Sequence, residues 1–69
     1  MKVIGELVKT KVDKIFNEGD ENEIMIPKNT EGTICEIYDE YKTVLVEIWG
    51  DNAPKDVSGV FLYSFDEIQ

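Results

Sequence analysis

The segment 43–49, Thr-Val-Leu-Val-Glu-Ile-Trp, limits most strongly what this chain can fold into. It is dense in β-branched and aromatic residues and is bounded by turn residues, which is the pattern of a β-strand. Residues 33–38, Thr-Ile-Cys-Glu-Ile-Tyr, carry a similar pattern just upstream, and only residues 39–42 separate the two runs. We therefore predict a β-hairpin formed by residues 33–38 and 43–49.

Upstream of this hairpin, the sequence predicts a strand, a loop and a short apolar run. Residues 6–16 alternate β-branched with charged side chains, which favours a half-buried strand, although several of them also fit a helical stripe. Residues 17–23 are polar around a central glycine, which predicts a solvent-facing loop. The run 24–26 ends at Pro27, and residues 28–32 are predicted to form a turn.

Downstream, residues 57–63 predict a further strand, in which Gly59 suggests a bulge or a close backbone approach. Ser64 and Glu67 have the spacing of a capping box, so a single helical turn is expected next. A chain of 69 residues is one domain with a marginal core. Because small all-β chains must hide their edges, we predict one all-β domain over residues 1–69, a partly open barrel of about four to five strands with a C-terminal helical turn.

The alternation along these strands also predicts the core. The side chains expected inside are Val8, Val12, Ile26, Ile34, Ile37, Val44, Val46, Ile48, Val60 and Leu62. Gly32 stands where a turn enters a strand, which suggests a backbone angle that other residues resist. Cys35 has apolar neighbours and no histidine to activate it, so it is expected to be a small buried hydrophobe.

A turn with a strand, a second strand, and a last strand with a helical turn follow one another in three segments. They are residues 27–38 (Pro-Lys-Asn-Thr-Glu-Gly-Thr-Ile-Cys-Glu-Ile-Tyr), 44–49 (Val-Leu-Val-Glu-Ile-Trp) and 60–68 (Val-Phe-Leu-Tyr-Ser-Phe-Asp-Glu-Ile). This pattern resembles small SH3-like barrels of the KOW-like type and bacterial or phage families of unknown function. The resemblance spans residues 24–68 and implies an SH3-like fold, which by itself does not fix a function. Small acidic chains of this kind also resemble, more loosely, immunity proteins and phage inhibitors.

The charge balance disfavours several classes of function. The chain has 15 Asp and Glu against seven cations, all of them lysine, and a formal net charge of −8, with no histidine. Arginine usually recognises phosphate in bidentate fashion, and histidine usually transfers protons near neutral pH or binds zinc. An acidic surface also repels nucleic acid. We therefore expect a protein that is not an enzyme, holds no metal or other cofactor, and does not favour nucleic acid.

The single cysteine, Cys35, rules out an intramolecular disulfide, and small secreted domains usually depend on disulfides. Residues 1–9 carry a charge every few positions, unlike a signal peptide. No apolar run approaches the roughly 18 residues that a membrane span needs. These features predict a cytoplasmic protein without a membrane segment.

Carboxylates in two turns, together with one tyrosine, are the candidate binding residues. A run of carboxylates in the loop 17–23 is most simply a solvated loop, and its spacing differs from that of an EF-hand, but it also suits a basic partner. In the hairpin turn, Tyr41 is the aromatic side chain expected to be most exposed. The predicted partner-binding residues are Glu18, Asp20, Glu21, Glu23, Asp39, Glu40, Tyr41 and Asp51.

The sequence thus favours a protein-binding module whose acidic face docks on a basic surface of another protein, as inhibitor, immunity protein or accessory subunit. Its combination of aromatic and acidic residues also suits a groove for Pro-rich peptides. Two alternatives remain open. One is a homo-oligomer formed through a strand edge or the Trp49 region. The other is a nucleic-acid-associated KOW-like domain, for which Lys9, Lys11 and Lys14 are the supporting basic residues.

Overall fold

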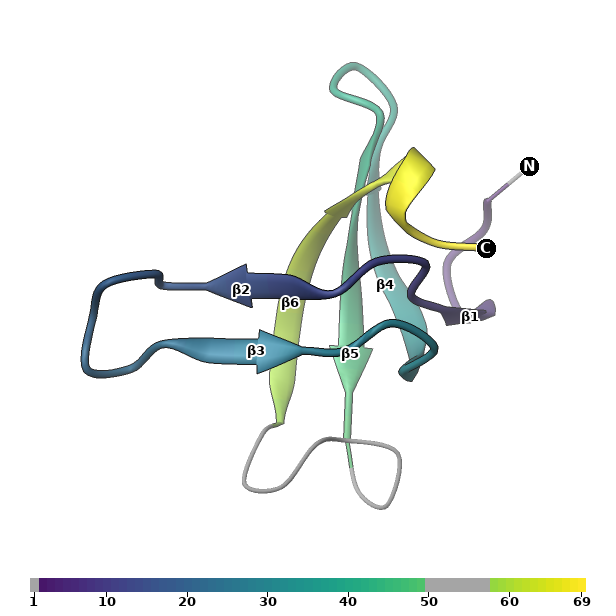
Figure 1. Cartoon of the computed structure of the whole chain (residues 1–69). Coiled ribbons are helices and arrows are strands. Elements are labelled where there is room, and N and C mark those ends of the chain that lie inside the picture. The colour runs from purple at the N-terminus through teal and green to yellow at the C-terminus, as the bar shows by residue number, and fades with distance from the viewer. Residues whose placement is uncertain (1, 50–57) are drawn as a thin grey trace.

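The computed structural model describes residues 2–49 and 58–69, which form β-strands and one 3₁₀ turn (Figure 1). The elements are β1 (Leu7–Lys9), β2 (Lys14–Phe16), β3 (Ile24–Ile26), β4 (Glu31–Tyr38), β5 (Thr43–Ile48), β6 (Gly59–Ser64) and η2 (Phe65–Glu67). An antiparallel sheet has the order β1-β4-β5-β6, and β2 and β3 form a separate two-stranded sheet. The all-β prediction is confirmed, but the described residues hold six strands rather than four or five, and the two sheets do not join into a closed barrel.

The predicted hairpin is the centre of the larger sheet. β4 and β5 pair along most of their length, and residues 39–42 connect them, as predicted. Their ladder shifts between Ile34 and Glu36, so the bulge lies in β4 at Cys35. The prediction of a bulge or close approach at Gly59 is wrong, because β6 pairs with β5 without a shift and a Cβ at Gly59 would meet nothing within 4 Å.

The single strand predicted over residues 6–16 is wrong, and so is the helical alternative. Thr10 is buried, its hydroxyl donates to the Pro27 carbonyl over 2.9 Å, and its N–H donates to the Thr30 carbonyl over 2.9 Å. These bonds fix the chain at the end of β1, and it bends over residues 11–13. The following residues therefore leave the larger sheet and pair with β3 as strand β2.

The β2–β3 hairpin lies across one face of the larger sheet, where Figure 1 shows it crossing β5 and β6. Its Phe16 ring packs on β6, with centroids 5.0 Å from Phe61 and 5.5 Å from Tyr63. Lys14 Nζ lies 4.9 Å from the centroid of the Tyr63 ring, within cation–π range. The hairpin therefore covers the inner face of the sheet and forms the second layer of the core.

Lys14 also ties this hairpin to the C-terminal turn. Its Nζ contacts Glu67 Oε1 at 2.7 Å and donates to the Leu62 carbonyl over 3.1 Å. The same Glu67 oxygen accepts the Ser64 N–H over 2.9 Å, so the predicted capping box and helical turn are confirmed. The chain then returns to β1, where Ile68 is buried and forms a bridge with Thr10.

The core lies between the larger sheet and the β2–β3 hairpin. Its buried apolar side chains are Val8, Ile26, Ile34, Val44, Val46, Ile48, Tyr63 and Ile68. Six predicted members are confirmed: Val8, Ile26, Ile34, Val44, Val46 and Ile48. Ile37 is half-buried and packs against this cluster. Val12, Val60 and Leu62 are exposed, so these three predictions are wrong.

The error in β6 is one of strand face. Both alternating sets along β6 are apolar, so the sequence pattern cannot decide which set points inward. Phe61 and Tyr63 point inward because they lie opposite the inward-facing Val46 and Val44 of β5 and bury larger rings. The Tyr63 hydroxyl is buried without a hydrogen-bond partner among the described residues, and burial, followed by the nearby Glu67 charge, raises its pKa to about 12.

Gly32 is required for close packing rather than for an unusual backbone angle. It lies in β4 opposite Val8, and it is not among the glycines with positive φ. A Cβ at this position would lie 2.5 Å from Val46 Cγ1 and 2.8 Å from the Glu47 carbonyl oxygen. The expectation of a special backbone angle is therefore wrong, and the reason for glycine here is the adjacent strand.

We predict that Gly32→Ala lowers the free energy of unfolding by about 1–3 kcal/mol, the usual cost of overpacking a core. Urea denaturation followed by tryptophan fluorescence or circular dichroism measures the change. A variant as stable as the wild type would contradict the close approach of β5 to this position.

We predict that Glu67→Gln removes a pH-dependent part of the stability. Burial alone would raise the pKa of Glu67, but the hydrogen bonds from Lys14 and Ser64 and the Lys14 charge outweigh burial and lower it. A carboxylate whose pKa is lower in the folded than in the unfolded state stabilises the protein at pH values above its unfolded-state pKa, which is about 4.3 for glutamate. This stabilisation is lost as the pH falls below that value. The wild type should therefore exceed the variant by about 1 kcal/mol near neutral pH.

Thermal or urea unfolding across a pH series tests this expectation. The difference between wild type and Glu67→Gln should shrink as the pH falls below about 4.3. Glu18→Gln, an equal change of charge in the exposed β2–β3 loop, serves as the control and should show no such trend. A constant difference at every pH would contradict a stabilising role for the Glu67 carboxylate.

Candidate functional site

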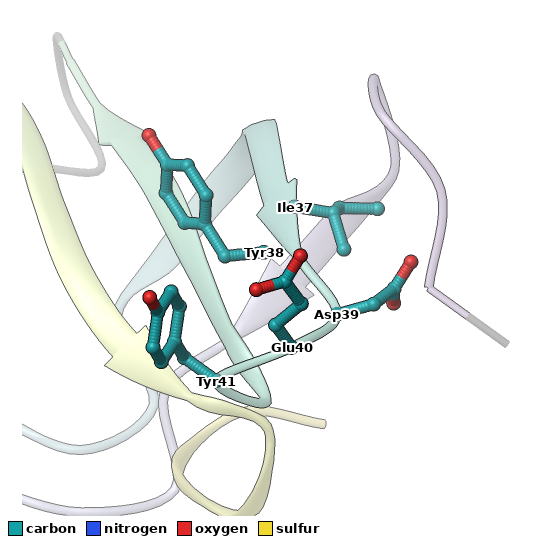
Figure 2. Close-up of a pocket in the computed structure, with 5 residues that line it drawn as sticks. All are labelled: Ile37, Tyr38, Asp39, Glu40 and Tyr41. Atoms are coloured by element: carbon teal, nitrogen blue, oxygen red, sulfur yellow. The ribbon is translucent and has the colours of Figure 1, made fainter.

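A shallow hollow lies at the turn between β4 and β5. It has a volume of about 340 Å³ and is lined by Ile37, Tyr38, Asp39, Glu40 and Tyr41 (Figure 2). These residues are consecutive, so a single turn supplies every side chain of the site. Three of the predicted binding residues, Asp39, Glu40 and Tyr41, are therefore among the residues that line the hollow.

The backbone holds this turn firmly at both ends. The Tyr41 N–H donates to the Tyr38 carbonyl over 3.1 Å, and Lys42 adopts a left-handed φ of 54° just before β5. The Lys42 carbonyl in turn accepts the Phe65 N–H over 2.8 Å. The turn is therefore fastened to η2, and its side chains project from a fixed base.

Two tyrosine rings dominate the hollow. Tyr41 is 74% exposed and Tyr38 is 40% exposed, although both are large rings in a chain with a small core. Figure 2 shows both rings on the same side of the turn with the Glu40 carboxylate beside them, while Ile37 and Asp39 point to the other side. Adjacent aromatic faces and a carboxylate suit a cationic side chain, which gains both cation–π attraction and a charged hydrogen bond.

Among the described residues, Asp39 and Glu40 form no ion pair, although Lys42 lies in the same turn. Within residues 2–49 and 58–69, the only ion pair is the one between Lys14 and Glu67. Asp39 and Glu40 are both exposed and lie outside that pair. Both carboxylates are therefore open to an external cation or a basic partner.

The other predicted binding residues lie elsewhere. Glu18, Asp20, Glu21 and Glu23 are exposed in the loop between β2 and β3, which Figure 1 places well away from the β4–β5 turn. Asp20 accepts the Asn22 N–H and Glu23 accepts the Gly19 N–H, so two of these carboxylates shape the loop itself. Asp51 lies outside the described residues. The predicted contact surface is therefore divided between two separate turns.

Sequence reasoning missed part of the site. Tyr38 and Ile37 were not among the predicted binding residues, although both line the hollow. The signal was present for Tyr38, because a residue directly before a tight turn lies next to the side chains of that turn. No group of three acidic or cysteine side chains in the described part of the chain is arranged to hold a metal ion. None of its helical residues forms a segment long and apolar enough to cross a membrane.

Cys35 is half-buried, not buried as predicted, because it directly follows the inward-facing Ile34 in β4. Burial raises the pKa of its thiol, and the charges of Glu47 and Glu36 raise it further. The thiol is therefore kept protonated and is a poor nucleophile at neutral pH.

No protein-family model matches the chain, and comparison with curated proteins and with solved structures finds no significant match either. The geometry and charge of the site are therefore the basis for assigning a function.

We predict that Glu47→Gln lowers the pKa of Cys35, because the variant removes the larger of the two charge contributions. The measurement is the rate of iodoacetamide alkylation of this single cysteine across a pH series. The rate profile of the variant should move to lower pH. Glu18→Gln should leave the profile unchanged, and an unmoved Glu47→Gln profile would contradict the placement of Glu47 beside the thiol.

Proposed function

We propose that this chain is a non-enzymatic protein-binding module that accepts a basic segment of a partner protein at the β4–β5 turn. The observation that carries the proposal is the hollow itself, in which the Glu40 carboxylate lies beside the exposed Tyr38 and Tyr41 rings and forms no ion pair among the described residues. A lysine or arginine side chain satisfies both the rings and the charge. The net charge of −8 supports the same reading, because it steers basic partners toward the surface.

We further propose that the fold is a variant of the SH3-like barrel. The sheet order β1-β4-β5-β6, the β2–β3 hairpin folded across one face, and the 3₁₀ turn that returns the chain to β1 support this assignment. The module would act in the cytoplasm, in keeping with its single free cysteine.

Nucleic-acid binding is less well supported. Of the three lysines that favoured it, Lys14 is held by Glu67 and by the Leu62 carbonyl, which leaves Lys9 and Lys11 exposed. Self-assembly through β6, which lies at the edge of the sheet, is also less well supported. Lys14 Nζ donates a hydrogen bond to the Leu62 carbonyl of this strand, so that carbonyl is already engaged within the chain.

Selection from a library of random peptides displayed on phage tests the proposal. The selected peptides should be enriched in lysine or arginine and depleted in acidic residues. Their affinity, measured by fluorescence anisotropy, should fall at high salt, as expected for binding to exposed charges. Failure to enrich any peptide, or enrichment of acidic ones, would contradict the proposed partner chemistry.

Matched variants identify the binding turn. Asp39→Asn with Glu40→Gln should weaken binding of a selected peptide about tenfold, the loss expected for a charged hydrogen bond. Glu18→Gln with Glu21→Gln changes the net charge equally but in the β2–β3 loop, and should have a much smaller effect. Equal losses in the two variants would mean that the overall charge, not the hollow, causes binding.

A further inference from the structure

On the outer face of the larger sheet, the part formed by β4, β5 and β6 is apolar on one side and acidic on the other, and β1 adds the exposed Leu7 and Lys9 beyond β4. Residues that alternate with the core point outward, and the pairing of β4, β5 and β6 places them in rows. One row is Glu36, Leu45 and Leu62, and the next is Thr33, Glu47 and Val60. The β6 side of this face is therefore aliphatic, while the β4 and β5 side carries two carboxylates.

This face is open to solvent. Leu62 is 47% exposed, Val60 is 51% exposed and Trp49 is 55% exposed, whereas the opposite face is covered by the β2–β3 hairpin. The indole N–H of Trp49 donates to Glu47 Oε2 over 2.9 Å, so the ring is held beside the acidic row. Among the described residues, nothing covers these side chains enough to bury them.

The outer face is continuous with the proposed binding hollow. Tyr38 pairs with Thr43, and that pair forms the row adjacent to Glu36 and Leu45. The half-buried outward-facing side chains of β5, which are Thr43, Leu45 and Glu47, therefore form a continuous strip from exposed Tyr38 to exposed Trp49. The six residue steps from Thr43 to Trp49 correspond to roughly 20 Å, the length of a helix of about 13 residues.

We propose that this strip binds an amphipathic basic helix of the partner protein. The inference rests on the proposed function, and it names the partner as a helix whose apolar stripe packs on Leu45, Val60 and Leu62. Lysine or arginine side chains flanking the stripe would pair with Glu36 and Glu47, and one end of the helix would reach Tyr38.

Charge complementarity favours a basic helix on this face over a second copy of the chain. A two-fold contact between identical faces would bring Glu36 and Glu47 of each copy against an equally acidic surface. Each copy also carries a net charge of −8, which opposes self-association. A basic helix instead balances both carboxylates while covering the same apolar side chains.

The test uses a synthetic amphipathic helix of leucine and lysine, with leucines spaced to form one stripe, and a control peptide in which every lysine is replaced by glutamate. Titration of the isotopically labelled protein, followed by amide chemical shifts in NMR spectra, maps the contact. The lysine peptide should shift the amide signals of β5 and β6. The glutamate peptide should not bind.

Substitutions on the outer face measure how much the apolar and the acidic side chains each contribute to peptide binding. Leu62→Gln should weaken the lysine peptide about fivefold or more through lost apolar contact. Glu36→Gln with Glu47→Gln should weaken it about tenfold, and clearly more than the equally charged Glu18→Gln with Glu21→Gln. Equal effects of the two double variants would overturn the inference, because binding would then be unspecific attraction to an acidic protein.

The remaining outcomes separate this inference from the proposed function. Shifts confined to residues 37–41, without any effect of Leu62→Gln, would overturn the helix site and leave the hollow as the binding site. Shifts confined to the β2–β3 loop would overturn both. Concentration-dependent broadening of β5 and β6 signals without peptide would overturn the inference in favour of a second copy of the chain.

Discussion

The packing of the β2–β3 hairpin on β6 determines how the rest of this small protein is arranged. The Phe16 ring of the hairpin contacts the rings of Phe61 and Tyr63. Lys14 of the same hairpin bonds to Glu67 and to a backbone carbonyl of β6. Without this layer, the inner face of the larger sheet would expose its apolar side chains, since a two-layer arrangement is what buries one face of a sheet. The hairpin and the C-terminal turn therefore stabilise each other through a few shared residues.

The β2–β3 hairpin covers one face of the larger sheet, and no described element covers the other face. Chains of about this size bury only about 60% of the surface exposed on unfolding. Exposed Leu62, Val60 and Trp49 are the result. An apolar face with interspersed carboxylates differs from an ordinary solvated surface, because the aliphatic side chains there gain free energy when a partner covers them.

The sequence predicted the elements better than their faces. The β4–β5 hairpin, the capping box at Ser64 and Glu67 and most of the core follow from local patterns that the structure retains. Val60 and Leu62 were misplaced because β6 is apolar on both faces, and the choice depends on contacts with Phe16, which comes from a distant part of the chain. The break after Thr10 was missed for the same reason, since its partners Pro27 and Thr30 are remote in sequence. The candidate site was predicted only in part, because the sequence does not show that the acidic turns lie apart.

The acidic residues acquire different roles from their surroundings. Glu67 is bound to Lys14 and Ser64 and stabilises the fold, and Glu23 shapes its own loop. Glu40 and Glu36 are exposed beside apolar or aromatic side chains and form no ion pair among the described residues. A carboxylate in that setting contributes little to folding, since exposed charges add little stability even when paired. It does, however, favour a basic partner over a neutral or acidic one, because like charges at a contact are costly. The carboxylates next to exposed apolar groups, rather than the most acidic loop, are therefore the ones that can confer specificity.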